Sequence, residues 1–294
     1  MNKHLIVQVL SDCHHLFENH NTTDTNYTNN STTFNDMVDK ILGSSKSFMI
    51  DVLCLAGNIG HLQNDYYRQF LIHISLFHKI RWNHIVYVLG SIESENLKGS
   101  KEDHHVDYLL WLKQYAPSVT LLHRTSLVIN DLYEIYGITA WIPPISDYAN
   151  CQVQRYHSYH DMQHLFKYMN SHYVYSLNTH SHQNSQKRIR IILTHFSPFQ
   201  MKESIQNTTW THLWKDCLYH IQKYPSHYKQ HLWICGGTEM NAHYNLYTAH
   251  FYQERRDSLE LWCHSLSSIR NLQLDNNVIP TFIQIYEPSI EKIV

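Results

Sequence analysis

The stretch LIVQVLSDCHH, residues 5–15, is an apolar run that ends abruptly on an acid, a thiol and two imidazoles. Uninterrupted apolar runs of about four to eight residues are typical of strands that are buried on both faces. Polar residues directly after such a strand have two explanations. They form a metal or ligand site, or they begin an ordinary surface loop, and this stretch alone leaves both open.

Four more apolar runs of strand length follow: DVLCLA (51–56), HIVYVLG (84–90), RIRIILT (188–194) and HLWICGG (231–237). Helical spacing of apolar residues predicts helices over 34–42, 64–80 and 104–115 between these runs. A hairpin is expected over 126–141, with its turn near Asn130-Asp131. Alternating runs at 245–251, 259–265 and 279–287 predict further strands. This order of elements favours an α/β layered fold.

Composition excludes several classes of protein. The formal net charge of −2 over 294 residues gives no general affinity for nucleic acid or an anionic membrane, so we expect neither as a partner. No stretch approaches the ~18 apolar residues of a membrane span, and the N-terminus lacks the features of a signal peptide. The six cysteines form no C-x-x-C pair, which predicts free thiols and a cytoplasmic location.

We expect a single domain over residues 1–294. Two polar, low-complexity segments, 19–33 and 178–187, are predicted to be loop insertions, because strand-like runs resume on either side of each.

The five apolar runs share one feature, which is the polar or glycine-rich residues at their ends. In an α/β sheet, residues just past the carboxyl ends of the strands collect in one crevice, where ligand sites are built. The sequence therefore predicts a binding crevice built from the strand ends SDCHH (11–15), AGNIG (56–60), LGSIE (89–93), THFSP (194–198) and CGGTEMN (235–241).

The order of these strand ends resembles the calcineurin-like metallophosphoesterase family. The motifs of that family run Asp-x-His, Gly-Asp, Gly-Asn-His-Glu/Asp, a strand-end His and Gly-His-x-His. The resemblance covers the chain from about residue 5 to about residue 250. It implies a four-layer sandwich, in which two mixed β-sheets are flanked by helices, with a dinuclear metal centre.

The resemblance is uneven at the positions of the metal ligands. Asp12 and His14 match the first motif, and Thr194-His195 matches the fourth. Gly57-Asn58 aligns with Gly-Asp, so the carboxylate that bridges the two metals in the family is an amide in this chain.

The third and fifth motifs depart further. Ser91 aligns with the ligand Asn of the family, and Ile92 with its catalytic His, which assists the departing oxygen. An isoleucine cannot do this. Gly237 and Glu239 align with the two histidines of Gly-His-x-His.

Two divalent cations about 3.5–4 Å apart need bridging anions to hold them together. An Asn amide is neutral and offers a single coordinating oxygen, so we expect no dinuclear centre. A site for a single divalent ion remains an open alternative. The ion would be Zn, Mn or Fe, and Asp12, His14 and Glu239 would hold it. The alternative is that Asp12 and His14 are remnants of the ancestral site, hydrogen-bonded to loop backbone.

The leading functional hypothesis is a metallophosphoesterase-fold protein without dinuclear catalysis. Such a protein would bind a protein partner or a phosphate-bearing ligand without turnover. The alternative hypothesis is a weak or divergent single-metal phosphoesterase that hydrolyses phosphate monoesters or diesters. Fold alone does not decide between these hypotheses.

Overall fold

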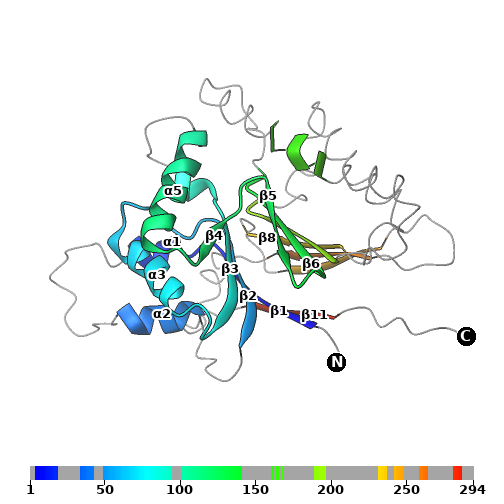
Figure 1. Ribbon diagram of the computed structural model, residues 1–294, viewed down its shortest axis with the longest axis horizontal. Coiled ribbons are helices and arrows are strands. Elements are labelled where there is room, and N and C mark those ends of the chain that lie inside the picture. The colour runs from blue at the N-terminus through cyan, green and yellow to red at the C-terminus, as the bar shows by residue number, and fades with distance from the viewer. Residues whose placement is uncertain are drawn as a thin grey trace, which may run out of the picture. The chain divides into compact units, whose positions relative to one another are not determined.

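The computed structural model describes residues 4–18, 34–42, 49–94, 101–140, 160–161, 163–165, 167–168, 189–196, 231–236, 242–247, 258–263 and 281–286. These residues form an α/β structure with two sheets (Figure 1). The chain divides into two compact units. Unit 1 comprises 1–121, 239–241 and 264–294, and unit 2 comprises 122–238 and 242–263. The predicted insertions at 19–33 and 178–187 lie outside the described residues, and a single domain over the whole chain stays a prediction.

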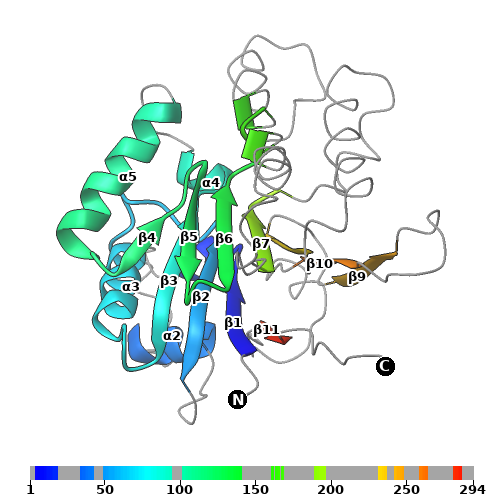
Figure 2. The same ribbon diagram turned by 45° about the vertical axis from the view of Figure 1, so that its right-hand side comes forward.

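Unit 1 contains a five-stranded mixed sheet with the order β11-β1-β2-β3-β4 (Figure 2). Strands β1 to β4 run parallel, and β11 pairs antiparallel with β1. The four strands predicted at 5–10, 51–56, 84–90 and 279–287 are confirmed, and the carboxyl ends of the first three lie along one edge of the sheet. The bounds are β1 His4–Leu10, β2 Ile50–Ala56, β3 Trp82–Val88, β4 Val119–Leu121 and β11 Thr281–Tyr286.

Three of the five described helices of unit 1, α2, α3 and α5, agree with the predicted positions except at some ends, and the two short helices α1 and α4 were not predicted. They are α1 His14–Glu18, α2 Phe34–Leu42, α3 Asp65–Leu76, α4 Ser91–Ser94 and α5 Lys101–Tyr115. The prediction that α3 continues to residue 80 is wrong. Lys79 has a left-handed backbone with φ of 71°, and its N–H donates to the carbonyl oxygen of Trp82. A residue in this conformation cannot continue a right-handed helix.

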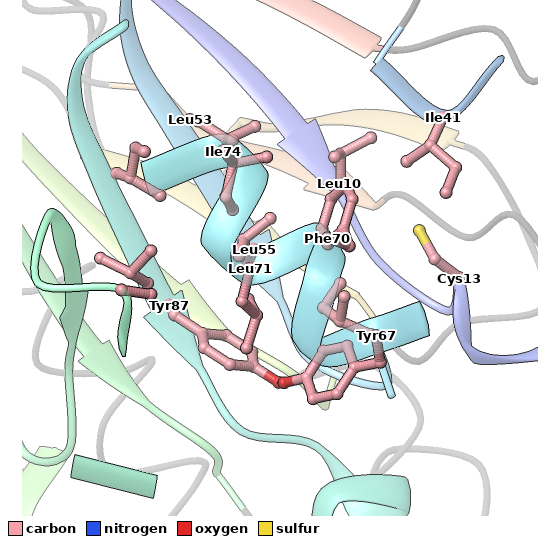
Figure 3. Close-up of a cluster of buried hydrophobic side chains, with 14 of the residues drawn as sticks. Leu10, Cys13, Ile41, Leu53, Leu55, Tyr67, Phe70, Leu71, Ile74 and Tyr87 are labelled. Carbon is pink, nitrogen blue, oxygen red and sulfur yellow. The ribbon is translucent and has the colours of Figure 1, made fainter. Parts of the chain in front are cut away.

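The core of unit 1 lies between the sheet and its helices. The buried side chains of α3 recur at three- and four-residue intervals, as one face of a helix requires. Figure 3 shows Leu71 and Ile74 of α3 beside Leu55 and Leu53 of β2. Residues on both faces of β2 are inaccessible to solvent, which confirms the prediction of a strand buried on both sides.

Unit 2 contains a six-stranded mixed sheet with the order β5-β6-β7-β8-β10-β9. The predicted hairpin is confirmed, and its turn residues Asn130 and Asp131 both have the positive φ that Asn and Asp tolerate better than most residues. The predicted strands at 188–194 and 231–237 are present, although the second ends two residues early. The bounds are β5 Thr125–Ile129, β6 Tyr133–Ile138, β7 Ile189–Thr194, β8 His231–Cys235, β9 Ala242–Tyr247 and β10 Ser258–Cys263.

The structure also bears on the expected absence of a membrane span and on the expected free thiols. No helix in the described part of the chain combines the length and the apolar character that crossing a bilayer demands. Cys13, Cys54 and Cys235 are buried free thiols.

Candidate functional site

The carboxyl ends of β1, β2 and β3 carry a polar cluster, which we call the edge cluster. Its members are Asp12, Asn58, Ser91 and Glu93. Backbone hydrogen bonds hold the first two loops together. The N–H of Asp12 donates to the Gly57 carbonyl at 3.1 Å, and the N–H of His14 donates to the Asn58 carbonyl at 3.2 Å.

The loops after β1 and β2 adopt an unusual backbone conformation. The φ angles are 55° at Asp12, 80° at Gly57 and 55° at Asn58, all in the left-handed region. Glycine, Asn and Asp enter this region at lower cost than other residues. The residue types at these positions are therefore favoured by the turns themselves as well as by the chemistry of their side chains.

The carboxylate of Asp12 is held by neutral donors. The residue is 4% exposed. Its Oδ2 accepts a hydrogen bond from the Ser11 hydroxyl at 2.9 Å, and its Oδ1 accepts one from Asn58 Nδ2 at 3.0 Å. Buried anions need such donors or a counter-ion. The side chain of Asp12 is thus joined to the side chains of Ser11 and Asn58.

The carboxamide of Asn58 has defined partners at both ends. Its Oδ1 accepts hydrogen bonds from the Ser91 hydroxyl at 3.1 Å and from the backbone N–H of Ile92 at 2.9 Å. A backbone N–H can only donate, so the oxygen must face Ile92 and the nitrogen must face Asp12. Both lone pairs of the Asn58 oxygen are consequently occupied.

Glu93 is the member of the edge cluster that sequence reasoning did not single out. Its side chain is completely buried, and each carboxylate oxygen accepts two hydrogen bonds. Oε1 accepts from Ile59 N–H at 2.7 Å and Tyr87 hydroxyl at 2.6 Å, and Oε2 accepts from Asn58 N–H at 3.0 Å and Gly90 N–H at 2.8 Å. The carboxylate therefore clamps the loop after β2 to the loop after β3. An acid three residues after a strand-end glycine was the available signal.

Two tyrosines continue this network into the core. The Tyr87 hydroxyl donates to Glu93, so the Tyr67 hydroxyl must donate to the Tyr87 oxygen, 2.7 Å away (Figure 3). Burial raises the pKa of Tyr87 well above its ordinary value, and the negative charge of Glu93 raises it further. Burial also raises the pKa of Tyr67. Both hydroxyls therefore stay protonated and serve as neutral donors.

Gly90 allows the loops after β2 and β3 to approach each other. A Cβ atom at this position would lie 2.5 Å from the Asn58 backbone nitrogen and 2.5 Å from its Oδ1. These distances are far below van der Waals contact, and one of the two atoms belongs to the backbone. Only glycine fits here without displacement of Asn58.

One further candidate, His195, lies at the carboxyl end of a strand of unit 2. His195 follows β7 and is 1% exposed. Beside it, the Thr194 hydroxyl accepts a hydrogen bond from Trp233 Nε1 at 2.9 Å and donates to the Phe196 carbonyl at 2.7 Å. Gly237 and Glu239 lie outside the described residues.

The structure thus joins Asp12, Asn58, Ser91 and Ile92 in one hydrogen-bond network of unit 1, to which His14 contributes its backbone N–H. Within the described ranges, no three His, Cys, Asp or Glu side chains form a group that could hold a metal ion. The proposed single-metal set includes Glu239, so that set stays a prediction.

No protein-family model matches the sequence, and no curated protein matches it. Among solved structures, the chain is similar to the phosphopantetheinyl hydrolase from Mycobacterium tuberculosis. The identity is 9% and the TM-score 0.49, over 96% of this chain and 97% of that chain. It is also similar to a putative 5′-nucleotidase from Staphylococcus aureus in complex with α-ketoglutarate. Here the identity is 10% and the TM-score 0.39, over 88% of this chain and 48% of that chain.

Proposed function

We propose that this chain is a divergent calcineurin-like metallophosphoesterase, with the four-layer sandwich of that family, that acts by binding and does not catalyse two-metal hydrolysis. The observation that carries the proposal is the hydrogen bonding of Asn58. Its amide nitrogen donates to Asp12, and its oxygen accepts from Ser91 and Ile92.

These hydrogen bonds disfavour a role for the Asn58 side chain as a ligand that bridges two metal ions. A metal ion could reach the Asn58 oxygen only if the Ser91 hydroxyl or the Ile92 N–H gave up its bond, which would leave a donor without its partner. The amide also supplies no negative charge to offset two cations. A dinuclear centre therefore does not fit these residues, and we derive no catalytic step from one.

The loop after β3 supports the same proposal. The Ser91 hydroxyl and the Ile92 N–H both donate to Asn58, and the Ile92 side chain has no group that could transfer a proton to a departing oxygen. Ser91 and Ile92 are half-buried, and their hydrogen bonds to Asn58 fix the conformation of the surface at the end of β3. We propose that the surface binds a protein partner or a phosphate-bearing ligand, and that the chain with its buried thiols resides in the cytoplasm.

The test is an assay of the purified chain with added Mn²⁺ or Zn²⁺ against a generic phosphomonoester and a generic phosphodiester. We expect no turnover, and elemental analysis should find at most one ion per chain. Turnover that Asp12→Ala abolishes and Asp65→Ala leaves intact would overturn the proposal. Asp65 is the matched control because its side chain is exposed on α3 of the same unit.

The single-metal alternative predicts a different pattern in the same assay. One ion would bind, and His14→Ala and Glu239→Ala would each lose both the ion and the turnover. Ion binding without turnover would leave the proposed binding function in place and would limit the correction to the cofactor.

A further inference from the structure

Strand β5 lies at one end of the sheet of unit 2, and among the described strands it pairs with β6 alone (Figure 1). Two hydrogen bonds show which backbone groups of β6 serve which neighbour. The Gly137 carbonyl accepts from the Arg124 N–H on the β5 side, and the Leu132 carbonyl accepts from the Ile189 N–H on the β7 side. Backbone groups alternate in direction along a strand, so odd-numbered residues of β6 bond to β5 and even-numbered ones to β7.

This alternation defines the outer edge of β5. Leu127 and the other odd-numbered residues of β5 face odd-numbered residues of β6, and their N–H and C=O groups belong to that ladder. The N–H and C=O groups of Ser126 and Val128 point the other way, and within the described part of the chain they have no hydrogen-bond partner. Thr125, Ser126 and Val128 are exposed, so the edge is accessible.

Strand β5 lacks the features that ordinarily protect an edge. Its sequence TSLVI contains no proline and no charged side chain, and it is rich in the β-branched residues that favour strands. An open edge of this composition is a template for pairing with another extended chain. The unpaired backbone groups therefore indicate the kind of occupant, which is a second β-strand.

The ends of β5 indicate which strand that is. His123 and Arg124 precede β5, and Asp131 lies in the turn that follows it. An antiparallel pair centred on Leu127 brings each basic end to the acidic turn of the other copy, because Leu127 lies four residues from both His123 and Asp131. Arg124 keeps its ion pair with Asp161 of the same copy, so His123 is the group that meets Asp131 directly. An imidazole carries an N–H donor in either protonation state, and a carboxylate accepts it.

We propose that the outer edge of β5 is a homodimer interface, occupied by β5 of a second copy in antiparallel orientation. In this register Ser126 of each copy faces Val128 of the other, and each such pair exchanges both of its backbone hydrogen bonds. Leu127 lies on the two-fold axis and faces its own counterpart. The contact is isologous, and it extends the sheet of unit 2 from one copy into the next.

The size of the interface sets the strength that we expect. A strand of 5 residues is roughly 17 Å long, and one strand pair buries less than the ~800 Å² per partner of a standard stable interface. Dimerisation should therefore depend on concentration, with a dissociation constant on the order of 10 μM.

The first test is sedimentation velocity of the full chain up to about 0.1 mM. Val128→Pro removes the outward N–H and leaves the ladder with β6 intact, because proline is tolerated where an edge strand faces solvent. This variant should weaken the dimer about tenfold or more, since the N–H of each copy no longer reaches the other. Val128→Ala keeps the N–H and is the matched control, which should dimerise like the parent.

The second test uses charge to measure the register. Ser126→Glu combined with Val128→Lys places opposite charges across both pairs and should preserve the dimer. Ser126→Lys combined with Val128→Lys places like charges there and should abolish the dimer below about 0.1 mM. A slip by two residues would bring like charges together in the first variant as well, so dimerisation of that variant specifies the register.

The third test is a crosslink at the two-fold axis. Leu127→Cys should form an intermolecular disulfide on mild oxidation, because facing Cα atoms in a pair of this kind lie about 4.5 Å apart. Thr125→Cys is the matched control, since its two copies are about 14 Å apart along the pair. The parent chain is oxidised in parallel. Crosslinking of Thr125→Cys but not Leu127→Cys would contradict the antiparallel register.

Failure of this pattern has a definite meaning. A parent chain that stays monomeric over the whole range would overturn the proposal. A dimer that Val128→Pro and the lysine pair leave unchanged would do the same, because its interface would lie elsewhere. Circular dichroism of each variant shows whether a loss of dimer reflects loss of fold, and the Leu127→Cys crosslink decides the matter where a variant does not fold.

Discussion

The two sheets join their neighbouring strand ends in different ways. At the carboxyl edge of the first sheet, backbone hydrogen bonds join the loops after β1 and β2, but side chains join the segments that follow β2 and β3. Glu93 and Asn58 together accept six hydrogen bonds there, one from Tyr87 of β3 and five from residues just after β2 and β3. At the corresponding edge of the second sheet, backbone joins backbone. The N–H of Gly236 donates to the Thr194 carbonyl at 3.1 Å, and the N–H of Phe196 donates to the Thr139 carbonyl at 3.3 Å.

This difference shows where residue identity matters. A backbone joint survives most substitutions, because every residue except proline carries the same N–H and C=O. A joint made by one carboxylate or one amide fails when that side chain changes. The first edge should therefore be far more sensitive to conservative substitution than the second, and four variants test that expectation.

Glu93→Gln should have the largest effect. The replacement nitrogen cannot accept, so two of the four donors around this buried carboxylate lose their partner. We expect a loss of about 4 kcal/mol in the free energy of unfolding, measured by urea denaturation. Asp107→Asn, an exposed carboxylate of the same unit, is the control and should cost less than about 0.5 kcal/mol. Equal stability of both variants would mean that Glu93 is not a clamp.

Asn58→Asp should come next, at about 3 kcal/mol near neutral pH. The variant loses the donor to Asp12 and places a second carboxylate 3.0 Å from the first. A divalent cation that neutralises the pair should recover part of the loss. Thermal unfolding with and without Mn²⁺ measures both effects, and Asn58→Ser controls for the missing amide. Full stability without metal would contradict the network drawn here.

Gly90→Ala should cost about 2 kcal/mol, because the added Cβ overlaps the Asn58 backbone and the loop must shift. Gln114→Ala, at an exposed position of α5 in the same unit, is the control and should be nearly neutral. Crystal structures of the parent and Gly90→Ala would locate the shift. A Gly90→Ala variant as stable as the parent would show that the two loops are not held at this separation.

Thr194→Val tests the second edge and should have the smallest effect, about 1 kcal/mol. The hydroxyl loses its bonds to Trp233 and Phe196, while both backbone joints remain. Urea denaturation followed by tryptophan fluorescence is a suitable measurement. A loss as large as that of Glu93→Gln would remove the contrast between the two edges.

Much of the fold was predictable from local pattern. Strands that are buried on both faces consist mostly of apolar residues, so LIVQVL and DVLCLA predicted β1 and β2. The turn at Asn130-Asp131 was predictable for a similar reason, because few residues accept its backbone conformation. The end of α3 was not, since apolar spacing continues past Leu76 although the backbone leaves the helical conformation at Phe77.

The candidate site was also predictable only in part. The sequence placed Asp12 and Asn58 at neighbouring strand ends, because the polar residues follow directly on apolar runs. It could not identify Glu93 as their support, because three of the four donors to its carboxylate are backbone N–H groups, which every sequence supplies equally.

The sequence by itself therefore determined the order of strands and helices, the turn residues and the polar identity of the strand ends, because these depend on the preferences of residues close together in the chain. The tertiary structure alone decided which hydrogen bonds the polar groups make and which side of α5 remains exposed. Those outcomes depend on residues far apart in sequence, such as Asp12, Asn58 and Glu93, that only the parallel pairing of β1, β2 and β3 brings within hydrogen-bond distance.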